Sequence, residues 1–312
     1  MRHLVTGGSG FIGSYLVREL NEENQDVTVF DVASNGRLAG LEKKVTVING
    51  DLLEMSDIIN AIKKQRIYSI FHLAGVMTDV CNANPFRAFR INCEGTANIL
   101  EAARICDVKT VIYSSSITVV DPKAPEPINE ESPRSPLDFY GATKLFGELL
   151  GSHYHSTYGI SFRALRFTTI YGPGRTSGFF TFASDLIRNP ALGKAAEVPF
   201  GPEMKGTWLY VKDAVRALAL AGGLQNKKHD VFNVVGHVLT LGQVADAVKT
   251  IIPDAVIRFS NVVRETPYCG AYDVKRAKTE LGWRQEYSIQ RGVEDTIRET
   301  RSHNRISGSD RS

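Results

Sequence analysis

The chain has 312 residues, of which 43% are hydrophobic and 23% charged, a composition typical of ordinary soluble globular proteins. Its 37 basic and 34 acidic residues give a net charge of +3, which does not favour nucleic acid or an anionic membrane as the main partner. The four cysteines form no CxxC pair and no metal-type cluster, and the longest apolar runs are far shorter than the ~18 residues that a membrane span needs. With no signal peptide ahead of the first strand, we predict a cytoplasmic protein with reduced thiols and no bound metal.

Strands and helices alternate through the first half of the chain. Buried strands are predicted at residues 3–6, 27–30, 45–48, 69–74, 110–114 and 160–167. Between them, helices are predicted at about 11–21, 56–65 and 85–106, and one that contains Tyr140. This alternation predicts an α/β fold with a Rossmann-type, doubly wound parallel sheet.

Beyond residue 170 the alternation becomes irregular. Helical patterns cover residues 179–188, 211–222, 241–252 and 291–300, with a short strand at 231–235. We predict that residues 1–170 form the sheet domain, to which later strands return, and that 171–301 form mainly a smaller α/β lid. Residues 302–312 are polar and rich in Ser, Gly and Arg, so a disordered tail is predicted there.

Three glycines, Gly7, Gly10 and Gly13, lie between the first strand and the first helix with GxxGxxG spacing. Glycine permits a tight turn and lets backbone N–H groups approach a pyrophosphate at the helix N-terminus, where the helix dipole favours anions. Asp31 ends the second strand, where a carboxylate can accept hydrogen bonds from adenosine ribose hydroxyls and would repel a 2′-phosphate. NAD is therefore the predicted cofactor, although Arg37 leaves NADP open, and Asp51 is predicted to contact the adenine amino group.

A serine, a tyrosine and a lysine make up the predicted catalytic group. Ser114-Ser115-Ser116 lies at the C-terminal end of the fifth strand, at the sheet edge where open α/β sheets bind ligands. Tyr140 and Lys144 are four residues apart, so their side chains lie on one helix face about one turn apart. A neighbouring ammonium favours the phenolate, which lowers the pKa of a tyrosine from its ordinary value of ~10 toward the working range of an acid/base. The three residues predict proton abstraction from an alcohol that loses a hydride.

Several further motifs accompany these residues. They are Thr6-Gly-Gly-Ser-Gly-Phe-Ile-Gly13, Gly50-Asp-Leu52, His72-Leu-Ala-Gly75, Asn92-Cys-Glu-Gly-Thr96, Ser114-Ser-Ser116, Tyr140-Gly-Ala-Thr-Lys144, Arg166, Tyr171-Gly-Pro-Gly174, Tyr210-Val-Lys-Asp213 and Glu280-Leu-Gly-Trp283. In these motifs the chain resembles the extended short-chain dehydrogenase/reductases, the NAD-dependent sugar epimerase/dehydratase superfamily, and within it the UDP-glucose 4-epimerase-like proteins.

The resemblance implies roles for individual residues. Ser116 would be the catalytic serine, Tyr140 the acid/base, and Lys144 both its activator and a ribose ligand. The cofactor-binding set would be Gly7, Gly10, Phe11, Ile12, Gly13, Asp31, Asp51, Leu52, Leu73, Ala74, Gly75, Asn92, Ser114, Tyr140 and Lys144. The family also implies a homodimer that pairs through the helices at 85–106 and 140–158.

The substrate side departs from the nucleotide-sugar pattern of this family. Thr169 replaces the usual asparagine, Lys205-Gly-Thr207 replaces an arginine, and Tyr268-Cys-Gly270 occupies the region of a second one. A lysine cannot reproduce bidentate phosphate binding, so Arg175 and Arg264 are candidates to hold a carboxylate or monophosphate instead. The substrate candidates are Thr78, Ser116, Thr118, Thr169, Arg175, Lys205 and Arg264.

The catalytic group alone does not decide the reaction. Ile117 and Thr118 occupy the positions where the family's 4,6-dehydratases carry acid/base carboxylates, which disfavours dehydration. The sequence favours an NAD-dependent epimerase or dehydrogenase that oxidises a secondary alcohol of a sugar or sugar-like substrate. Of these two reactions, the nucleotide-sugar 4-epimerase-like reaction is slightly favoured. The alternatives are an NAD-dependent dehydrogenase of a small sugar acid or hydroxy acid and, from another class, a non-catalytic dinucleotide-sensing regulator.

Overall fold

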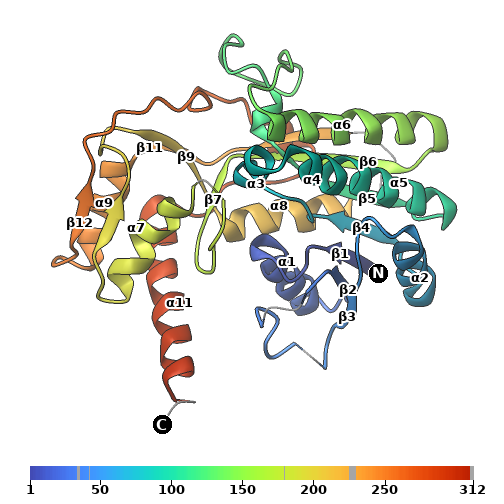
Figure 1. The fold of residues 1–312 in the computed structure, drawn as a ribbon, viewed down its shortest axis with the longest axis horizontal. Helices are drawn as coiled ribbons and strands as arrows, with labels where there is room; N and C mark the ends of the chain where they lie inside the picture. Colours follow the sequence, from blue (N-terminus) through green and yellow to red (C-terminus); the bar gives the residue numbers. More distant parts are fainter. Residues whose placement is uncertain (34–35, 42, 179, 225–229, 310–312) are drawn as a thin grey trace. The chain divides into compact units, whose positions relative to one another are not determined.

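The computed structural model describes residues 1–33, 36–41, 43–178, 180–224 and 230–309 (Figure 1). Its chain divides into two compact units. The first unit comprises Met1–Phe167, Ala214–Val234 and Tyr272–Arg284. The second unit comprises Thr168–Asp213, Val235–Ala271 and Gln285–Ser312. The chain therefore returns twice to the first unit after leaving it.

A seven-stranded parallel sheet forms the centre of the first unit. Its strand order is β10-β6-β5-β4-β1-β2-β3. The strands are β1 (Arg2–Thr6), β2 (Asp26–Asp31), β3 (Thr46–Asn49), β4 (Ser69–His72), β5 (Thr110–Ser116), β6 (Ser161–Phe167) and β10 (Asp230–Val234). The order runs outward in opposite directions from the β1–β4 pair, the switch point at which such sheets bind ligands. The predicted Rossmann-type, doubly wound sheet is confirmed.

Helices cover both faces of this sheet (Figure 1). On one face lie α2 (Met55–Gln65), α5 (Gly95–Ile105) and α6 (Phe139–Tyr158); on the other lie α1 (Phe11–Glu22) and α8 (Val211–Gly223). Their apolar side chains pack against alternate strand residues. A buried cluster on the α2–α5–α6 face contains Leu4, Ile70, Tyr113 and Phe162.

Helix α6 approaches β5 and β6 unusually closely because glycines face the sheet. A Cβ atom on Gly147 would lie 2.5 Å from the Tyr113 hydroxyl, and one on Gly151 would lie 2.2 Å from the Phe162 ring. Such distances exclude any side chain at either position without a shift of the helix. The start of α6 is fixed by Asp138, whose side chain accepts a hydrogen bond from the Gly141 N–H at 2.7 Å.

The long helix predicted at 85–106 is interrupted. It consists of α4 (Pro85–Phe89), a π-helical turn at Arg90–Glu94, and α5. A π-turn inserts one residue into the helical repeat and changes which side chains face inward, which an apolar periodicity of 3.6 cannot reveal. The preceding short helix α3 (Thr78–Ala83) is also absent from the sequence prediction.

The second unit contains two small sheets. One has the order β11 (His237–Thr240), β9 (Lys205–Tyr210), β7 (Thr169–Tyr171), and the other pairs β12 (Ile257–Phe259) with β8 (Ala196–Val198). Its helices are α7 (Thr181–Ala191), α9 (Leu241–Ile251) and α11 (Ile289–Ser309), whereas the short α10 (Lys275–Thr279) belongs to the first unit. These strands have three to six residues, too few for a clear alternation of apolar and polar residues.

Helix α11 continues to Ser309, into the segment 302–312 for which a disordered tail is predicted. Ile289, Val293 and Ile297 are buried at four-residue spacing, and α11 packs against α7 and α9. Arg301 extends this contact by donating a hydrogen bond from Nε to the Ala191 carbonyl. Phe179, the predicted start of α7, and residues 310–312 lie outside the described residues.

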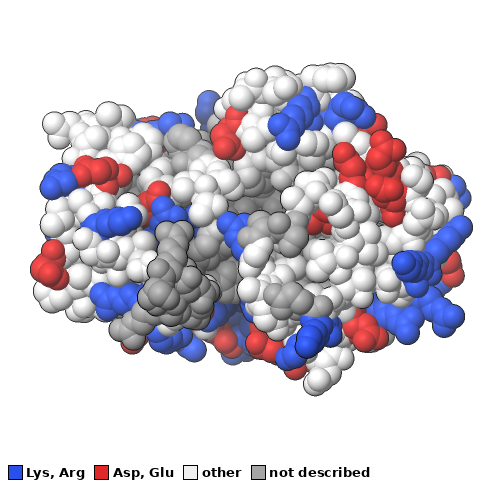
Figure 2. Space-filling view, turned by 60° about the horizontal axis from the view of Figure 1, so that its bottom comes forward, with Lys and Arg blue, Asp and Glu red and all other residues white. Residues whose placement is uncertain are grey.

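Basic and acidic side chains are interspersed over the face of the molecule drawn in Figure 2. No broad field of one sign covers that face among the described residues, as the near-balanced composition leads one to expect. Among the helices that the structure describes, none combines the length and the apolar character needed to cross a bilayer.

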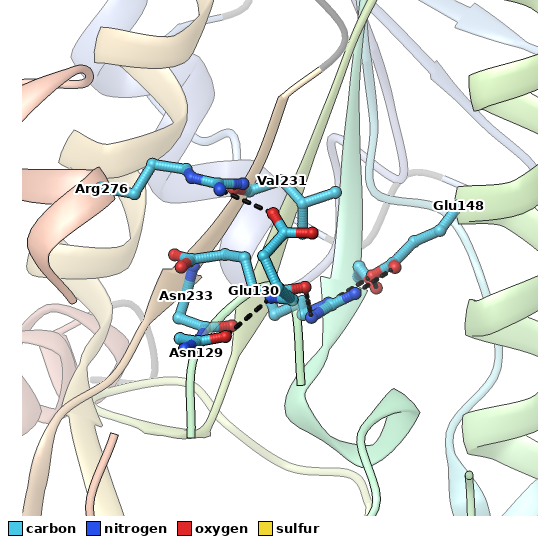
Figure 3. A network of polar contacts seen from close by, with 9 residues as sticks. Asn129, Glu130, Glu148, Val231, Asn233 and Arg276 are labelled. Carbon is cyan, nitrogen blue, oxygen red and sulfur yellow. Dashed lines mark hydrogen bonds and ion pairs between the residues drawn. The ribbon is translucent and has the colours of Figure 1, made fainter. Parts of the chain in front are cut away.

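A buried polar network joins α6 to three strands of the sheet (Figure 3). Glu148 on α6 and Arg166 on β6 form a two-bond ion pair at 2.9 and 2.7 Å, with both side chains 1% exposed. The Ser115 hydroxyl on β5 donates to the same carboxylate at 2.6 Å, and Arg166 also donates to the Glu130 carbonyl. The Glu130 carboxylate in turn accepts from the Asn233 N–H on β10 at 2.8 Å. The network thus fixes the carboxyl end of β5, directly beside Ser114 and Ser116.

Glu148→Gln should lower the free energy of unfolding by about 3–5 kcal/mol, because it leaves the buried Arg166 charge without its counter-charge. Asp26→Asn is the matched control in the same unit, since its ion pair with Arg2 is exposed and 3.6 Å long and should contribute less than about 1 kcal/mol. Urea unfolding followed by circular dichroism measures both. Equal losses in the two variants would contradict a structural role for the buried pair.

Candidate active site

The glycine loop joins β1 to α1 at the switch point of the sheet. Gly7 has a φ of +68°, which favours glycine, and its N–H donates to the Phe30 carbonyl at 3.0 Å. A Cβ atom on Gly13 would lie 2.1 Å from the Gly7 oxygen, so the loop lies directly on the first helical turn. Gly10 is the N-cap residue, and among the described residues no side chain caps this end of α1. Bare backbone N–H groups at a helix N-terminus fit the pyrophosphate of a dinucleotide.

Asp31 lies next to this loop at the end of β2. Its Oδ2 accepts a hydrogen bond from the Ser9 N–H at 3.0 Å, which fixes the carboxylate beside the glycines. Phe11 and Ile12 occupy the first turn of α1 and are partly buried. The structure therefore brings together the acidic residue and the glycine loop, as the predicted dinucleotide site requires.

The other predicted adenine-side residues follow β3. The Asp51 carboxylate accepts from the Leu53 N–H at 3.0 Å and so closes its own turn. Leu52 is buried against Gly95, where a Cβ atom would lie 3.0 Å from the Leu52 Cβ, and its carbonyl accepts from Asn98. These contacts fix the Asp51–Leu52 backbone.

A hydrogen-bond chain through His72 connects the glycine loop to the π-turn. The Thr6 hydroxyl accepts from the Ala74 N–H at 3.2 Å and lies 2.8 Å from His72 Nδ1. On the other side, Thr96 lies 3.0 Å from Nε2 and donates its own proton to the Asn92 carbonyl at 2.5 Å. Since the Thr96 proton is already used, we assign the imidazole proton to Nε2, which leaves Nδ1 to accept from Thr6.

Burial lowers the pKa of His72 to about 3, and the nearby Lys144 charge acts in the same direction. The histidine is therefore neutral at physiological pH, as the assigned tautomer requires. The main chain of Leu73 also donates to the Thr6 carbonyl at 3.3 Å. His72 thus joins three segments predicted to line the cofactor: the glycine loop, Leu73-Ala-Gly75 and the region of Asn92.

Asn92, in the π-turn, uses its whole amide. Its Oδ1 accepts from the Val76 N–H at 2.8 Å, and its Nδ2 donates to the Val76 carbonyl at 3.0 Å and to the Thr143 hydroxyl at 3.1 Å. Thr143 in turn donates to the Tyr140 carbonyl at 2.7 Å. The side chain predicted to contact the cofactor therefore ties the loop after β4 to the helix that carries Tyr140.

Ser116 lies at the end of β5 and caps a short 3₁₀ turn, Ile117–Val119. Its hydroxyl oxygen accepts from the Thr118 N–H at 3.2 Å and from the Thr118 hydroxyl at 2.9 Å. A Cβ atom on Gly141 would lie 2.5 Å from the Thr118 carbonyl oxygen, so the first turn of α6 lies against this turn. Ser116 and Tyr140 therefore come from neighbouring backbone segments.

Tyr140 and Lys144 are both buried at the start of α6. The Tyr140 ring packs against Cys81 and Ala88, and the Lys144 Nζ lies 5.7 Å from the centre of that ring. The ammonium donates to the Ser114 carbonyl at 2.9 Å. Burial lowers the pKa of Lys144 to about 8, so most of the lysine is still charged at neutral pH.

The predicted substrate residues are divided between the two units. Thr78 begins α3 in the first unit, whereas Thr169, Arg175, Lys205 and Arg264 belong to the second. Arg175 is buried and donates to the Ile170 carbonyl, while the Arg264 guanidinium lies 5.5 Å from the centre of the Phe200 ring. Lys205 begins β9, and its carbonyl accepts from Thr266.

The sequence prediction missed the three threonines that organise this site, Thr6, Thr96 and Thr143. Each lies inside a motif already singled out, next to or between residues with predicted roles. Their positions within those motifs were the sequence feature that could have indicated a role in the site. Their contacts with His72 and Asn92 that join separate segments span 66, 24 and 51 residues of the chain, which the local pattern does not show.

The sheet order, the glycine loop at the switch point and the fixed acidic residue after β2 define a dinucleotide-binding Rossmann protein. Residues 3–235 match the family described as the NAD dependent epimerase/dehydratase family. The chain belongs to this family.

Similar proteins include both epimerases and a dehydrogenase. A putative UDP-glucose 4-epimerase from Methanocaldococcus jannaschii is 29% identical, with 97% of this chain and 99% of that protein covered. A D-erythronate dehydrogenase from Cupriavidus necator is 31% identical, with 93% and 95% covered. The crystal structure of the Thermus thermophilus UDP-glucose 4-epimerase in complex with NAD superposes with a TM-score of 0.84 at 26% identity, covering 96% of this chain and 99% of that one.

These comparisons identify the chain as an enzyme of the extended short-chain dehydrogenase/reductase type with NAD as its cofactor. The predicted enzyme class and cofactor are confirmed. The alternative prediction of a non-catalytic dinucleotide sensor is set aside.

Two buried histidines make stability depend on pH. Burial lowers the pKa of His3 to about 4 and that of His72 to about 3, from an ordinary value of 6.5 in the unfolded chain. Their contribution to stability is therefore present above pH 6.5 and is lost as pH falls toward the folded-state values. Each histidine should add a slope of about 1.4 kcal/mol per pH unit below that pH.

His72→Gln should remove one such contribution from the slope of unfolding free energy between about pH 6.5 and 5. Urea titrations at a series of pH values measure it. His153→Gln, a substitution of an exposed histidine in the same unit, is the control. An unaltered slope in the His72 variant would show that this imidazole is protonated in the folded protein.

Proposed function

We propose that the chain oxidises a secondary alcohol of a sugar or sugar-like substrate by hydride transfer to NAD. The observation that carries this proposal is the buried Lys144 ammonium, fixed by the Ser114 carbonyl at 2.9 Å and lying 5.7 Å from the centre of the Tyr140 ring. A cation in this place favours the phenolate form of Tyr140. The proposed catalytic residues are Ser116, Tyr140 and Lys144.

In the proposed mechanism the Tyr140 phenolate takes the proton of the reacting hydroxyl. The Ser116 hydroxyl donates a hydrogen bond to the same oxygen and stabilises its developing negative charge. Lys144 stabilises the phenolate throughout. Bound NAD supplies the hydride acceptor, and the reverse proton transfer from Tyr140 restores the alcohol when the hydride returns.

The proposed cofactor contacts follow the geometry of the first unit, the proposed NAD-binding domain. The glycine loop with Phe11 and Ile12 would hold the pyrophosphate, and Asp31 the adenosine ribose. Asp51 and Leu52 would contact adenine, and Leu73-Ala-Gly75 would lie along the dinucleotide. The second unit is the proposed substrate-binding lid, with Thr169, Arg175, Lys205 and Arg264 as substrate contacts.

A 4-epimerase-like reaction is the first candidate, supported by the relatives and solved structures described as UDP-glucose 4-epimerases. In that reaction the ketone intermediate rotates within the site and receives the hydride on its opposite face. The enzyme then returns to its starting redox state in each cycle, and no reduced cofactor is released.

A dehydrogenase of a small sugar acid or hydroxy acid is the second candidate. Two observations favour it: the 31% identical relative is a D-erythronate dehydrogenase, and Thr169 and Lys205 depart from the nucleotide-sugar pattern. A small acid needs a carboxylate ligand in place of a diphosphate site. Arg175 and Arg264 are the proposed ligands of that carboxylate.

A substrate panel tests the proposed function and separates the two candidates. Purified protein with NAD is incubated with UDP-sugars, free sugars, uronates and four-carbon sugar acids, while absorbance at the NADH band and sugar isomers are recorded. Accumulation of NADH identifies the dehydrogenase, and isomer formation without NADH identifies the epimerase.

For either reaction, Tyr140→Phe should lower turnover by a few hundredfold or more, as expected for loss of an acid/base group.

The affinity for NAD, measured by quenching of the protein fluorescence, should be nearly unchanged in Tyr140→Phe. Tyr158→Phe, at an exposed position near the end of the same helix, is the control and should retain full turnover. Near-normal turnover of the Tyr140 variant on an identified substrate would refute the proposed acid/base.

We also propose a homodimer that pairs through α4, α5 and α6. These adjoining helices expose large apolar side chains, among them Phe86 at 73%, Phe89, Phe146 and Leu149 at 52%. An exposed apolar surface of this kind marks a protein interface.

We also propose a cytoplasmic location. The unpaired cysteines of the described chain fit the reducing environment of that compartment.

Leu149→Asp should weaken the dimer roughly tenfold or more, because it buries a charge in the proposed interface. Light scattering coupled to size-exclusion chromatography across a dilution series measures this. Val263→Asp is the control, since Val263 is equally apolar and 75% exposed but lies in the second unit. A wild-type protein that is monomeric at micromolar concentration would disprove the dimer.

A further inference from the structure

We propose that the buried ring of Tyr113 is a positioning residue for catalysis, which holds Lys144 in its charged form through a cation–π contact. The Lys144 Nζ lies 5.0 Å from the centre of the Tyr113 ring, within the range of such contacts. The proposal rests on the role of Lys144 given above, but its central claim concerns the lysine itself. No motif or family role assigned above includes Tyr113.

The charge of Lys144 has few other supports. Within the described residues, no carboxylate lies within ion-pair distance of Lys144, and its one hydrogen bond there goes to the Ser114 carbonyl. The ammonium is nevertheless buried, with the residue only 5% exposed. A charge in that position needs compensation from nearby dipoles and aromatic faces. The rings of Tyr113 and Tyr140 are the two aromatic faces within 6 Å of it in the described part of the chain.

The remaining titratable groups near Lys144 carry no charge at neutral pH. Burial raises the pKa of Cys81, and raises that of Cys93 to about 11. His72 is neutral for the reasons given above, and burial also raises the pKa of Tyr113. From the π-turn, β4 and β5, therefore, only neutral groups face the lysine, and the Asp79 and Asp138 carboxylates act on the neighbouring Cys81 thiol, whose pKa they raise. Tyr140 on α6 becomes the one anionic partner when it ionises.

The Tyr113 ring is held in one orientation. It stacks between His72, at a centroid distance of 5.8 Å and an interplanar angle of 30°, and Phe162, at 6.0 Å and 29°. Gly147 covers its hydroxyl end, where a Cβ atom would lie 2.5 Å away. The glycine allows α6 to approach β5 closely enough for Lys144 to reach the ring. Packing thus fixes the geometry that a cation–π contact needs.

The hydroxyl group of Tyr113 is not part of this role. Its oxygen is buried and makes no hydrogen bond of normal distance and angle among the described residues. The aromatic face therefore carries the effect. Replacement by phenylalanine keeps that face and makes a matched control, whereas fluorination of the ring weakens its negative face with little change of shape.

Weakening the negative face of the ring at position 113 should lower the pKa of Lys144, because the charged form of the lysine loses stabilisation while the neutral form does not. We expect Tyr113→Phe to leave this pKa near that of the wild type. Pentafluorophenylalanine at position 113 should lower it by about one pH unit, the size that a desolvated cation–π contact implies. Tyr113→Leu should act in the same direction, and thermal melting checks the fold of every variant.

The pKa of Lys144 is measured directly on the cofactor-free protein, from the pH dependence of its ¹³Cε chemical shift. The signal is assigned by its absence in Lys144→Met. In activity assays the alkaline limb of the pH profile should move to lower pH in the same order of variants, because the ammonium is lost earlier. A merely structural role for Tyr113 would lower stability without moving either titration.

Equal lysine pKa values in the phenylalanine and pentafluorophenylalanine proteins, both folded, would overturn the proposal. This result is independent of the proposed function, because no substrate or cofactor is present. If the pKa shifts but Tyr140→Phe retains turnover, the ring supports the lysine as proposed, and the catalytic assignment fails instead.

Discussion

The close approach of α6 to the central sheet is the constraint on which the rest of the site depends. Gly147 and Gly151 leave no side chain between the helix and the rings of Tyr113 and Phe162. A bulkier residue at either position would push the helix outward. Lys144 would then lose both its aromatic neighbour and its hydrogen bond to the Ser114 carbonyl. Packing between a helix and a strand thereby sets the electrostatics of the proposed catalytic group.

Two buried polar systems stabilise this arrangement from opposite sides. Behind the site, the Glu148–Arg166 pair and Ser115 fix α6 to β5 and β6. Toward the glycine loop, the chain through His72 and Asn92 joins the neighbouring loops. Because almost all of these polar groups are hydrogen-bonded, their burial is tolerated and each side chain has one geometry. A site that transfers hydride needs such preorganisation.

The titratable groups around the buried Lys144 are neutral, so the lysine charge dominates the electrostatics of the site. With His72 and the two cysteines uncharged near pH 7, the charged lysine and the tyrosine, which gains and loses the proton, form the local pair of the proposed reaction. Dipoles and ring faces then have a larger effect than they would in water, since little else screens them. The same site therefore serves either candidate reaction. The choice between release and return of the hydride belongs to the substrate side, where this chain departs from the nucleotide-sugar pattern.

The sequence by itself determined the doubly wound sheet, the glycine loop and the placing of Tyr140 and Lys144 one helical turn apart. Each of these follows from a local pattern: the alternation of strands and helices, the spacing of glycines, and the repeat of a helix. The tertiary structure alone decided the π-turn around Asn92, the hydrogen-bond chain through His72, and the contact of Tyr113 with Lys144. Those features depend on packing between segments distant in the chain, and a local pattern carries no record of which distant side chains will meet.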